Sequence, residues 1–140
     1  MKIIEDINNK WGKLRYVQDL ISFNKKDYWQ TPLEFLENGK GDCEDFAIAK
    51  YFDLKHNGID SWLVYCIDKR NNEYHMVCFY DGIILDINKI YNLNNFNFCP
   101  FQSIYGFNEE SFYNFSNFKI VGKDLGVYRL SKWIDILNRI

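Results

Sequence analysis

Near residue 60 the spacing of apolar residues changes from a helical to a strand period, and this change limits the folds open to the chain. The part before it opens with an amphipathic helical pattern, weakened near Gly12 and formed by Ile3, Ile4, Ile7, Trp11 and Leu14. After it, the segments 61–67 ("SWLVYCI") and 73–80 ("EYHMVCFY") have the composition and length of strands. Helices followed by consecutive strands predict an α+β fold with an antiparallel sheet.

Two further helices have recognisable ends. In "TPLEFLENG", Thr31 is a suitable N-cap, with Pro32, Glu34 and the closing Gly39 completing a helix at 32–38. The next helix is predicted to begin at Cys43, with Asp42 as N-cap, Asp45 at the capping-box position and Gly58 at its end. Its expected buried face consists of Ala47, Ile48, Tyr51 and Leu54.

The second half is predicted as a meander with a weakly patterned stretch after it. Asp81-Gly82 is a strong hairpin signal between 73–80 and a third strand at 83–87. Residues 91–118 are rich in Asn and aromatic residues and are expected to be mostly irregular, with a possible short strand near 118–122. Ser131 is the expected N-cap of a final helix whose apolar face is Leu130, Ile134, Leu137 and Ile140.

Length and composition exclude several classes of protein. A chain of 140 residues suits one domain, 1–140, and a net charge of −2 gives no electrostatic case for nucleic-acid binding. No stretch approaches the roughly 20 apolar residues of a membrane span, and no signal peptide is recognisable. As written the chain is expected to be cytoplasmic, or periplasmic if an export signal has been trimmed. The cysteines Cys43, Cys66, Cys78 and Cys99 form no C-x-x-C pair and are expected to be reduced.

The hairpin register brings a histidine and an aspartate together. If Asp81-Gly82 is a two-residue loop, Val77 faces Asp86, and His75 and Asp86 become diagonal neighbours on one face. Cys43 is expected at a helix N-terminus, where the dipole and amide groups favour a thiolate. Cysteine, histidine and a carboxylate together form a nucleophile, base and orienter set.

Each of these residues also has a purely structural interpretation. A strand histidine is often structural, and Asp42, Glu44 and Asp45 could be helix-capping charges. The other three cysteines are expected to be buried apolar residues, and His56 a solvated helix end. A zinc site formed by His75 and Cys78 is disfavoured, since residues three apart on a strand point to opposite faces.

Taken together, "DYWQTPLEFLENGKGDCEDFAIAKYFDL", "HMVCFYDG" and "ILDI" resemble the bacterial transglutaminase-like cysteine peptidases, the LapG-like family. The resemblance implies a papain- or transglutaminase-like α+β fold, with the nucleophile helix packed against an antiparallel sheet. It also implies Cys43 as nucleophile, His75 as general base and Asp86 as orienting acid. LapG-like members are calcium-dependent, with acidic ligands beside the nucleophile, which implies Ca²⁺ bound by Asp42, Glu44 and Asp45.

Calcium would offset the negative charge that otherwise keeps the thiol protonated. For the oxyanion hole, the Cys43 amide and Trp29 are candidates. LapG-like proteins are exported and cleave a large surface adhesin in the periplasm, which the resemblance implies as substrate. No export signal is recognisable here, so the substrate of this chain is open.

We therefore expect a monomeric cysteine endopeptidase acting on a protein substrate. The alternatives are a transglutaminase or deamidase acting on glutamine with the same residues, and a calcium-stabilised binding module without activity.

Overall fold

A computed structural model of the chain describes residues 2–17, 28–95 and 99–140. Helix α1 (Lys2–Gly12) buries Ile4, Ile7 and Trp11, as its apolar pattern predicts. Ile3 is 40% exposed, so its assignment to the buried stripe was wrong, because adjacent residues project in different directions around a helix. Strand β1 (Arg15–Tyr16) then pairs in parallel with β2 (Lys40–Gly41), tying the N-terminal part to the segment just before Asp42.

The two capped helices begin where the sequence predicts. Helix α3 (Pro32–Asn38) has the full Thr31/Glu34 capping box and ends at Gly39 in the left-handed conformation. Helix α4 (Cys43–His56) has Asp42 as N-cap, and its capping box with Asp45 is formed.

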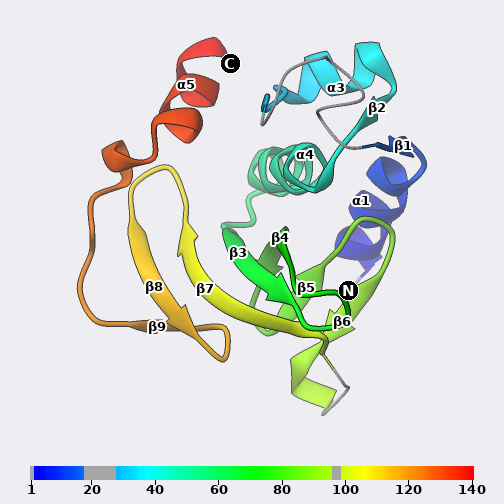
Figure 1. Ribbon diagram of the computed structural model, residues 1–140. Helices are drawn as coiled ribbons and strands as arrows, with labels where there is room; N and C mark the ends of the chain where they lie inside the picture. Colours follow the sequence, from blue (N-terminus) through cyan, green and yellow to red (C-terminus); the bar gives the residue numbers. More distant parts are fainter. Residues whose placement is uncertain (1, 18–27, 96–98) are drawn as a thin grey trace.

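Helix α4 lies at the centre of the molecule (Figure 1), and its first ten residues are all buried. The predicted face is buried, but the prediction missed that Phe46, Lys50 and Phe52 are buried as well. Helices α1 and α3 and the sheet surround α4, so no face of its first ten residues is left for solvent. His56, at the end, is exposed, as expected.

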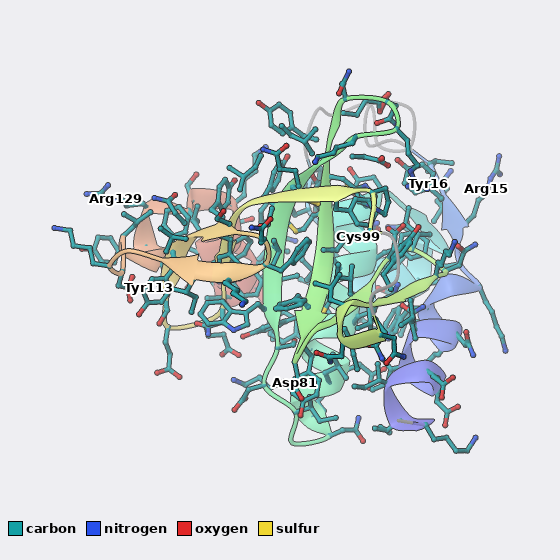
Figure 2. All side chains as sticks on the ribbon, turned by 90° about the horizontal axis from the view of Figure 1, so that it is seen from below. Arg15, Tyr16, Asp81, Cys99, Tyr113 and Arg129 are labelled. Atoms are coloured by element: carbon teal, nitrogen blue, oxygen red, sulfur yellow. The ribbon has the colours of Figure 1, made fainter. Side chains whose placement is uncertain are left out.

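A curled antiparallel sheet of seven strands packs against α4, in the order β6-β5-β4-β3-β7-β8-β9. Its strands are β3 (Trp62–Asp68), β4 (Glu73–Tyr80), β5 (Ile83–Leu85), β6 (Ile90–Asn92), β7 (Phe101–Phe107), β8 (Phe112–Ser116) and β9 (Lys119–Val121). The predicted hairpin register is confirmed: Tyr80 pairs with Ile83, and Asp81 lies at the tip (Figure 2). The ladder stops at Leu85, opposite Cys78.

The expectation that 91–118 is mostly irregular was wrong. Outside residues 96–98, which the structure does not describe, this stretch contains the end of β6, the 3₁₀ turn η1 (Leu93–Asn95), and strands β7 and β8, and β7 pairs directly with the central strand β3. The register between β3 and β7 shifts at Tyr65/Cys66, and such an irregularity interrupts the alternation that sequence analysis relies on. The short strand expected near 118–122 is confirmed as β9.

The C-terminal helix α5 (Ser131–Arg139) follows the 3₁₀ turn η2 (Val127–Arg129). Ser131 is its first residue and not its N-cap; Leu130 holds that position without a side-chain cap. The predicted apolar face is confirmed only in part: Leu130 and Leu137 pack against the core, but Ile140 is exposed and the fully buried residues are Trp133 and Ile136. Trp133 packs edge-on against Phe107 and stacks on Phe52, which anchors α5 to the core.

Buried side chains form two clusters. One lies between the helices and the sheet and includes Phe46, Ile48, Met76 and Cys78. The other includes Val64, Val77, Ile84 and Phe101. Because strand residues alternate between faces, Met76 and Val77 belong to different clusters. Cys66 and Cys78 are buried as expected, Cys99 is half-buried, and all four cysteines are free thiols. In the described ranges, no helix has the length and apolar character needed to cross a membrane.

Candidate active site

Cys43 is the first residue of α4, and the residues before it are fixed by close packing. An ideal Cβ at Gly41 would lie 2.6 Å from Oδ2 of Asp45 and 2.8 Å from Nε2 of Gln30. Any side chain at position 41 would therefore push apart the group that caps the helix. This explains the glycine in "GKGDC" and holds Cys43 at a defined helix N-terminus.

The carboxylate of Asp45, two residues after Cys43, accepts three hydrogen bonds. Its Oδ1 accepts from the backbone N–H of Gln30 at 2.8 Å, and its Oδ2 accepts from Asp42 N–H and from Gln30 Nε2, both at 3.0 Å. Burial raises the pKa of the Asp45 carboxyl, while these donors act against the rise. Sequence reasoning missed Gln30, because a buried glutamine has no distinctive pattern in sequence.

His75 and Asp86 meet, as the hairpin register predicts. Nε2 of His75 lies 2.6 Å from Oδ1 of Asp86, and both side chains are 13% exposed. The His75 ring stacks on Phe101 at 5.2 Å between centroids, which limits its rotation. Burial raises the pKa of Asp86, but the contacts with His75, the Ile87 amide and Lys50 outweigh it, so the pKa lies below its ordinary value.

Cys43 reaches the same strand through Met76. Strand β5 covers β4 only from Cys78 to Tyr80, and α4 packs against β4. The Met76 backbone amide, one residue from His75, lowers the pKa of the Cys43 thiol. No hydrogen bond joins Cys43 to the His75 ring in the part of the chain that the structure describes.

The surroundings of Cys43 keep its thiol protonated. Burial raises the pKa of Cys43 well above its ordinary value, and the charges of Glu44 and Asp42 raise it further, while the Met76 amide lowers it. Tyr16 lies in the same environment: burial, then the charges of Cys43, Asp42 and Glu44, raises its pKa to about 12.

The three acids predicted as calcium ligands differ in their contacts. Both oxygens of Asp45 accept amide hydrogen bonds. Asp42 and Glu44 are buried, and Glu44 Oε2 accepts from the Tyr65 hydroxyl at 3.5 Å. Within residues 2–17, 28–95 and 99–140, no group of three or more His, Cys, Asp or Glu is arranged to hold a metal ion. Two buried carboxylates nevertheless suit a hard cation, because each is costly to bury without a positive charge nearby.

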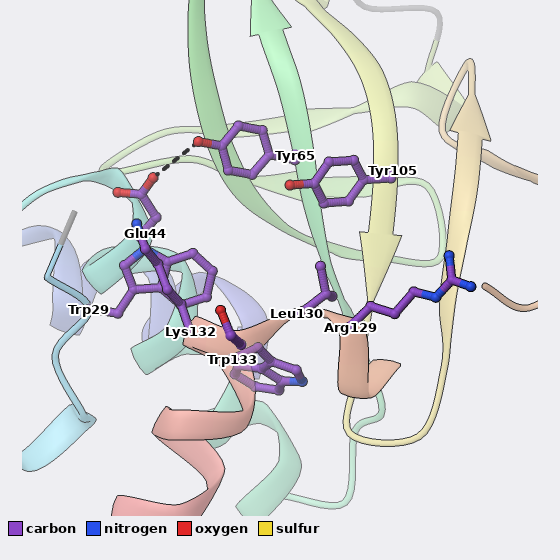
Figure 3. Close-up of a pocket in the computed structure, with 9 residues that line it drawn as sticks. Trp29, Glu44, Tyr65, Tyr105, Arg129, Leu130, Lys132 and Trp133 are labelled. Carbon is purple, nitrogen blue, oxygen red and sulfur yellow. Dashed lines mark hydrogen bonds between the residues drawn. The ribbon is translucent and has the colours of Figure 1, made fainter. Parts of the chain in front are cut away.

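A cleft beside the start of α4 is lined by Trp29, Glu44, Tyr65, Tyr105 and residues 129–133 (Figure 3). Tyr65 and Tyr105 stack with ring centroids 5.4 Å apart, forming a flat aromatic wall. Glu44 places this cleft next to the first turn of α4.

Comparison with known proteins identifies the family. Residues 1–105 match the bacterial transglutaminase-like cysteine proteinases. The chain belongs to this family. The EGTA-treated structure of LapG from Legionella pneumophila is similar to this chain at 31% identity and a TM-score of 0.82, covering 99% of this chain and 77% of that one. The calcium-bound LapG structure matches at 30% identity and a TM-score of 0.79, covering 99% and 78%.

A comparison with curated protein sequences gave no match. The family and the LapG-like structure together support a cysteine peptidase, and they confirm the transglutaminase-like fold class predicted from the sequence.

Proposed function

We propose that the chain is a calcium-dependent cysteine endopeptidase in which Cys43, His75 and Asp86 act together. The observation that carries the proposal is the 2.6 Å contact of His75 with Asp86, on the strand against which the helix of Cys43 packs. Hydrogen bonds between catalytic groups are often long before substrate binds, so the missing Cys43–His75 bond is compatible with it.

The proposed reaction has two halves. Asp86 accepts from Nε2 of His75, which leaves Nδ1 to take the proton of Cys43 as its sulfur attacks a peptide carbonyl carbon. His75 then returns that proton to the leaving amine, and the peptide bond breaks to give a thioester. In the second half, water gives a proton to His75 and its oxygen attacks the thioester, which releases the acid and restores the thiol.

We propose Asp42 and Glu44 as the calcium ligands. LapG from Legionella pneumophila has been solved in a calcium-bound and an EGTA-treated form. Bound calcium would supply positive charge against the two acids that raise the pKa of Cys43. A role for Asp45 as a ligand stays a prediction, since its oxygens already accept amide hydrogen bonds.

The test is incubation of the protein and of Cys43→Ser with a bacterial proteome in calcium, followed by sequencing of new N-termini. We expect new termini with the active protein only. If the fragments come from surface proteins with repeats, the substrate of this chain is a surface adhesin. Deamidated or crosslinked glutamines without new termini would favour a transglutaminase or deamidase. No change in either sample would favour a binding module.

A further inference from the structure

Lys50 is a buried cation for which the proposed reaction has no use. Among the residues that the structure describes, Lys50 is the one buried lysine or arginine, and its side chain is 0% exposed. Lysine is almost never fully buried unless it is paired. Its presence in the run "FAIAKYF" therefore requires a partner, and the partners are two backbone carbonyls.

The Lys50 ammonium donates to the carbonyl oxygens of Asp86 and Ile87. These are the orienting acid itself and the residue after it. Lys50 lies about two helical turns beyond Cys43 on the same face of α4, so one helix face carries both the proposed nucleophile and the group that holds the Asp86 backbone. Burial lowers the pKa of Lys50 to about 8, which leaves the side chain mostly charged at neutral pH.

The turn after Asp86 is also in close contact with Gly12 of α1. An ideal Cβ at Gly12 would lie 3.1 Å from the Ile87 carbonyl oxygen and 3.2 Å from Cβ of Asn88. Within the turn, the Asp86 amide donates to the Lys89 carbonyl at 2.8 Å. The short ladder of β5 ends at Leu85, so Lys50, Gly12 and this internal bond determine where Asp86 lies.

We propose that Lys50 is a positioning residue, whose buried ammonium fixes the backbone of Asp86 and thereby the orientation of the His75 ring toward Cys43. The inference rests on the proposed function of Cys43, His75 and Asp86. It adds a physical link between the nucleophile helix and the orienting acid. Without the ammonium, the two carbonyls lose their donor and the turn can shift. A shift of about 1 Å at a catalytic group is enough to cost roughly a hundredfold in rate.

The test measures the rate of Cys43 alkylation by iodoacetamide at one neutral pH, on the full chain in calcium, so no substrate is needed. Lys50→Met should slow alkylation about tenfold or more. The matched control is Lys55→Met on the same helix, which removes an exposed ion pair with Glu109 and should leave the rate unchanged. Nitrogen NMR shifts of the His75 ring should also change in Lys50→Met, because Asp86 no longer selects one tautomer.

A double-mutant cycle separates positioning from general loss of structure. Asp86→Asn should slow alkylation, and adding Lys50→Met to it should change the rate less than about twofold, since Lys50 acts through Asp86. If Asp86→Asn alone has no effect, the proposed function fails and this inference falls with it. If Asp86→Asn slows the reaction but Lys50→Met does not, or if the two effects simply add, only the inference is overturned.

Gly12→Ala provides a second variant should Lys50→Met fail to fold. Alanine is favourable in a helix, so the fold should be kept, while the new methyl group presses on the Ile87 carbonyl oxygen to which Lys50 donates. We expect slower alkylation with an unchanged far-UV spectrum. An unchanged rate in Gly12→Ala would then overturn the inference.

Discussion

Opposing influences act on the Cys43 thiol at the residue scale. The helix N-terminus and the Met76 amide favour the thiolate, whereas burial and the charges of Glu44 and Asp42 favour the thiol. Burial and the two charges outweigh the other influences, so the pKa of Cys43 is raised. In the proposed function, a positive charge beside Glu44 and Asp42 would cancel their part of this rise, while the larger part, which comes from burial, would remain.

The first residue-scale prediction is that calcium accelerates alkylation of Cys43. Without it the raised pKa leaves little thiolate at neutral pH, and binding by Asp42 and Glu44 should increase the rate roughly tenfold for each unit by which the pKa falls. Cys99 is the internal control, because it is half-buried and lies apart from these acids in sequence, so its rate should not depend on calcium. His75→Ala should remove most of the calcium effect.

Peptide mapping after timed exposure to iodoacetamide, with calcium or with EGTA, would give the rate at each cysteine. Equal rates for Cys43 in the two conditions would contradict the coupling of metal to thiol. Equal rates for all four cysteines would remove Cys43 as the proposed nucleophile.

The elements were predictable where short-range chemistry determines them. Pro32 and Gly39 delimit α3, Asp42 starts α4, and Asp81-Gly82 sets the register that brings His75 to Asp86. Helix caps and hairpin turns depend on residues that are close together in the sequence, so they can be predicted from one sequence alone.

Long-range packing explains what could not be predicted. Strand β7 pairs with β3 across a register shift, which breaks its apolar period. The burial of Lys50 depends on the Asp86 and Ile87 carbonyls, which are distant in the sequence. In the sequence, the only indication of this burial is a lone lysine within an apolar run. The predicted face of α5 missed Trp133, because contacts with Phe52 and Phe107 bury this residue and the helical pattern alone does not show them.

The two capping boxes give a prediction at the element scale. Thr31→Ala removes one hydrogen bond at α3 and should lower the free energy of unfolding by about 1 kcal/mol. Asp45→Ala at α4 removes an acceptor of three buried amide hydrogen bonds, so it should lower the free energy by about 3 kcal/mol or more. Urea unfolding monitored by circular dichroism measures both.

Comparing Asp45→Ala with Thr31→Ala, each with and without calcium, also decides the role of Asp45. If Asp45 only caps α4, the variant should be less stable yet still gain stability from calcium. Equal losses in the two variants, or an Asp45→Ala protein that no longer responds to calcium, would show that the capping account of Asp45 is incomplete.

At the scale of the whole molecule, the site joins two halves of the chain. Cys43 and its acids lie at the start of a central helix, while His75 and Asp86 belong to the sheet that packs against it. Contacts through Met76 and Lys50 cross this boundary. Anything that relieves repulsion at the start of α4 should therefore stabilise the fold as a unit.

The last prediction is that calcium raises the melting temperature of the whole chain. At a hundredfold excess over its dissociation constant, a ligand of the folded state adds about 2.7 kcal/mol, which corresponds to roughly 10 °C for a domain of this size. Asp42→Asn keeps a good N-cap and Glu44→Gln keeps the side-chain volume, yet both should weaken the calcium effect because each removes a charge. Melting in calcium, in EGTA, and in EGTA with excess magnesium provides the comparison. Magnesium should substitute poorly, since it requires a tighter octahedral shell. Identical melting in all three conditions would mean that Asp42 and Glu44 serve only the helix terminus, and calcium would have to be withdrawn from the proposed function.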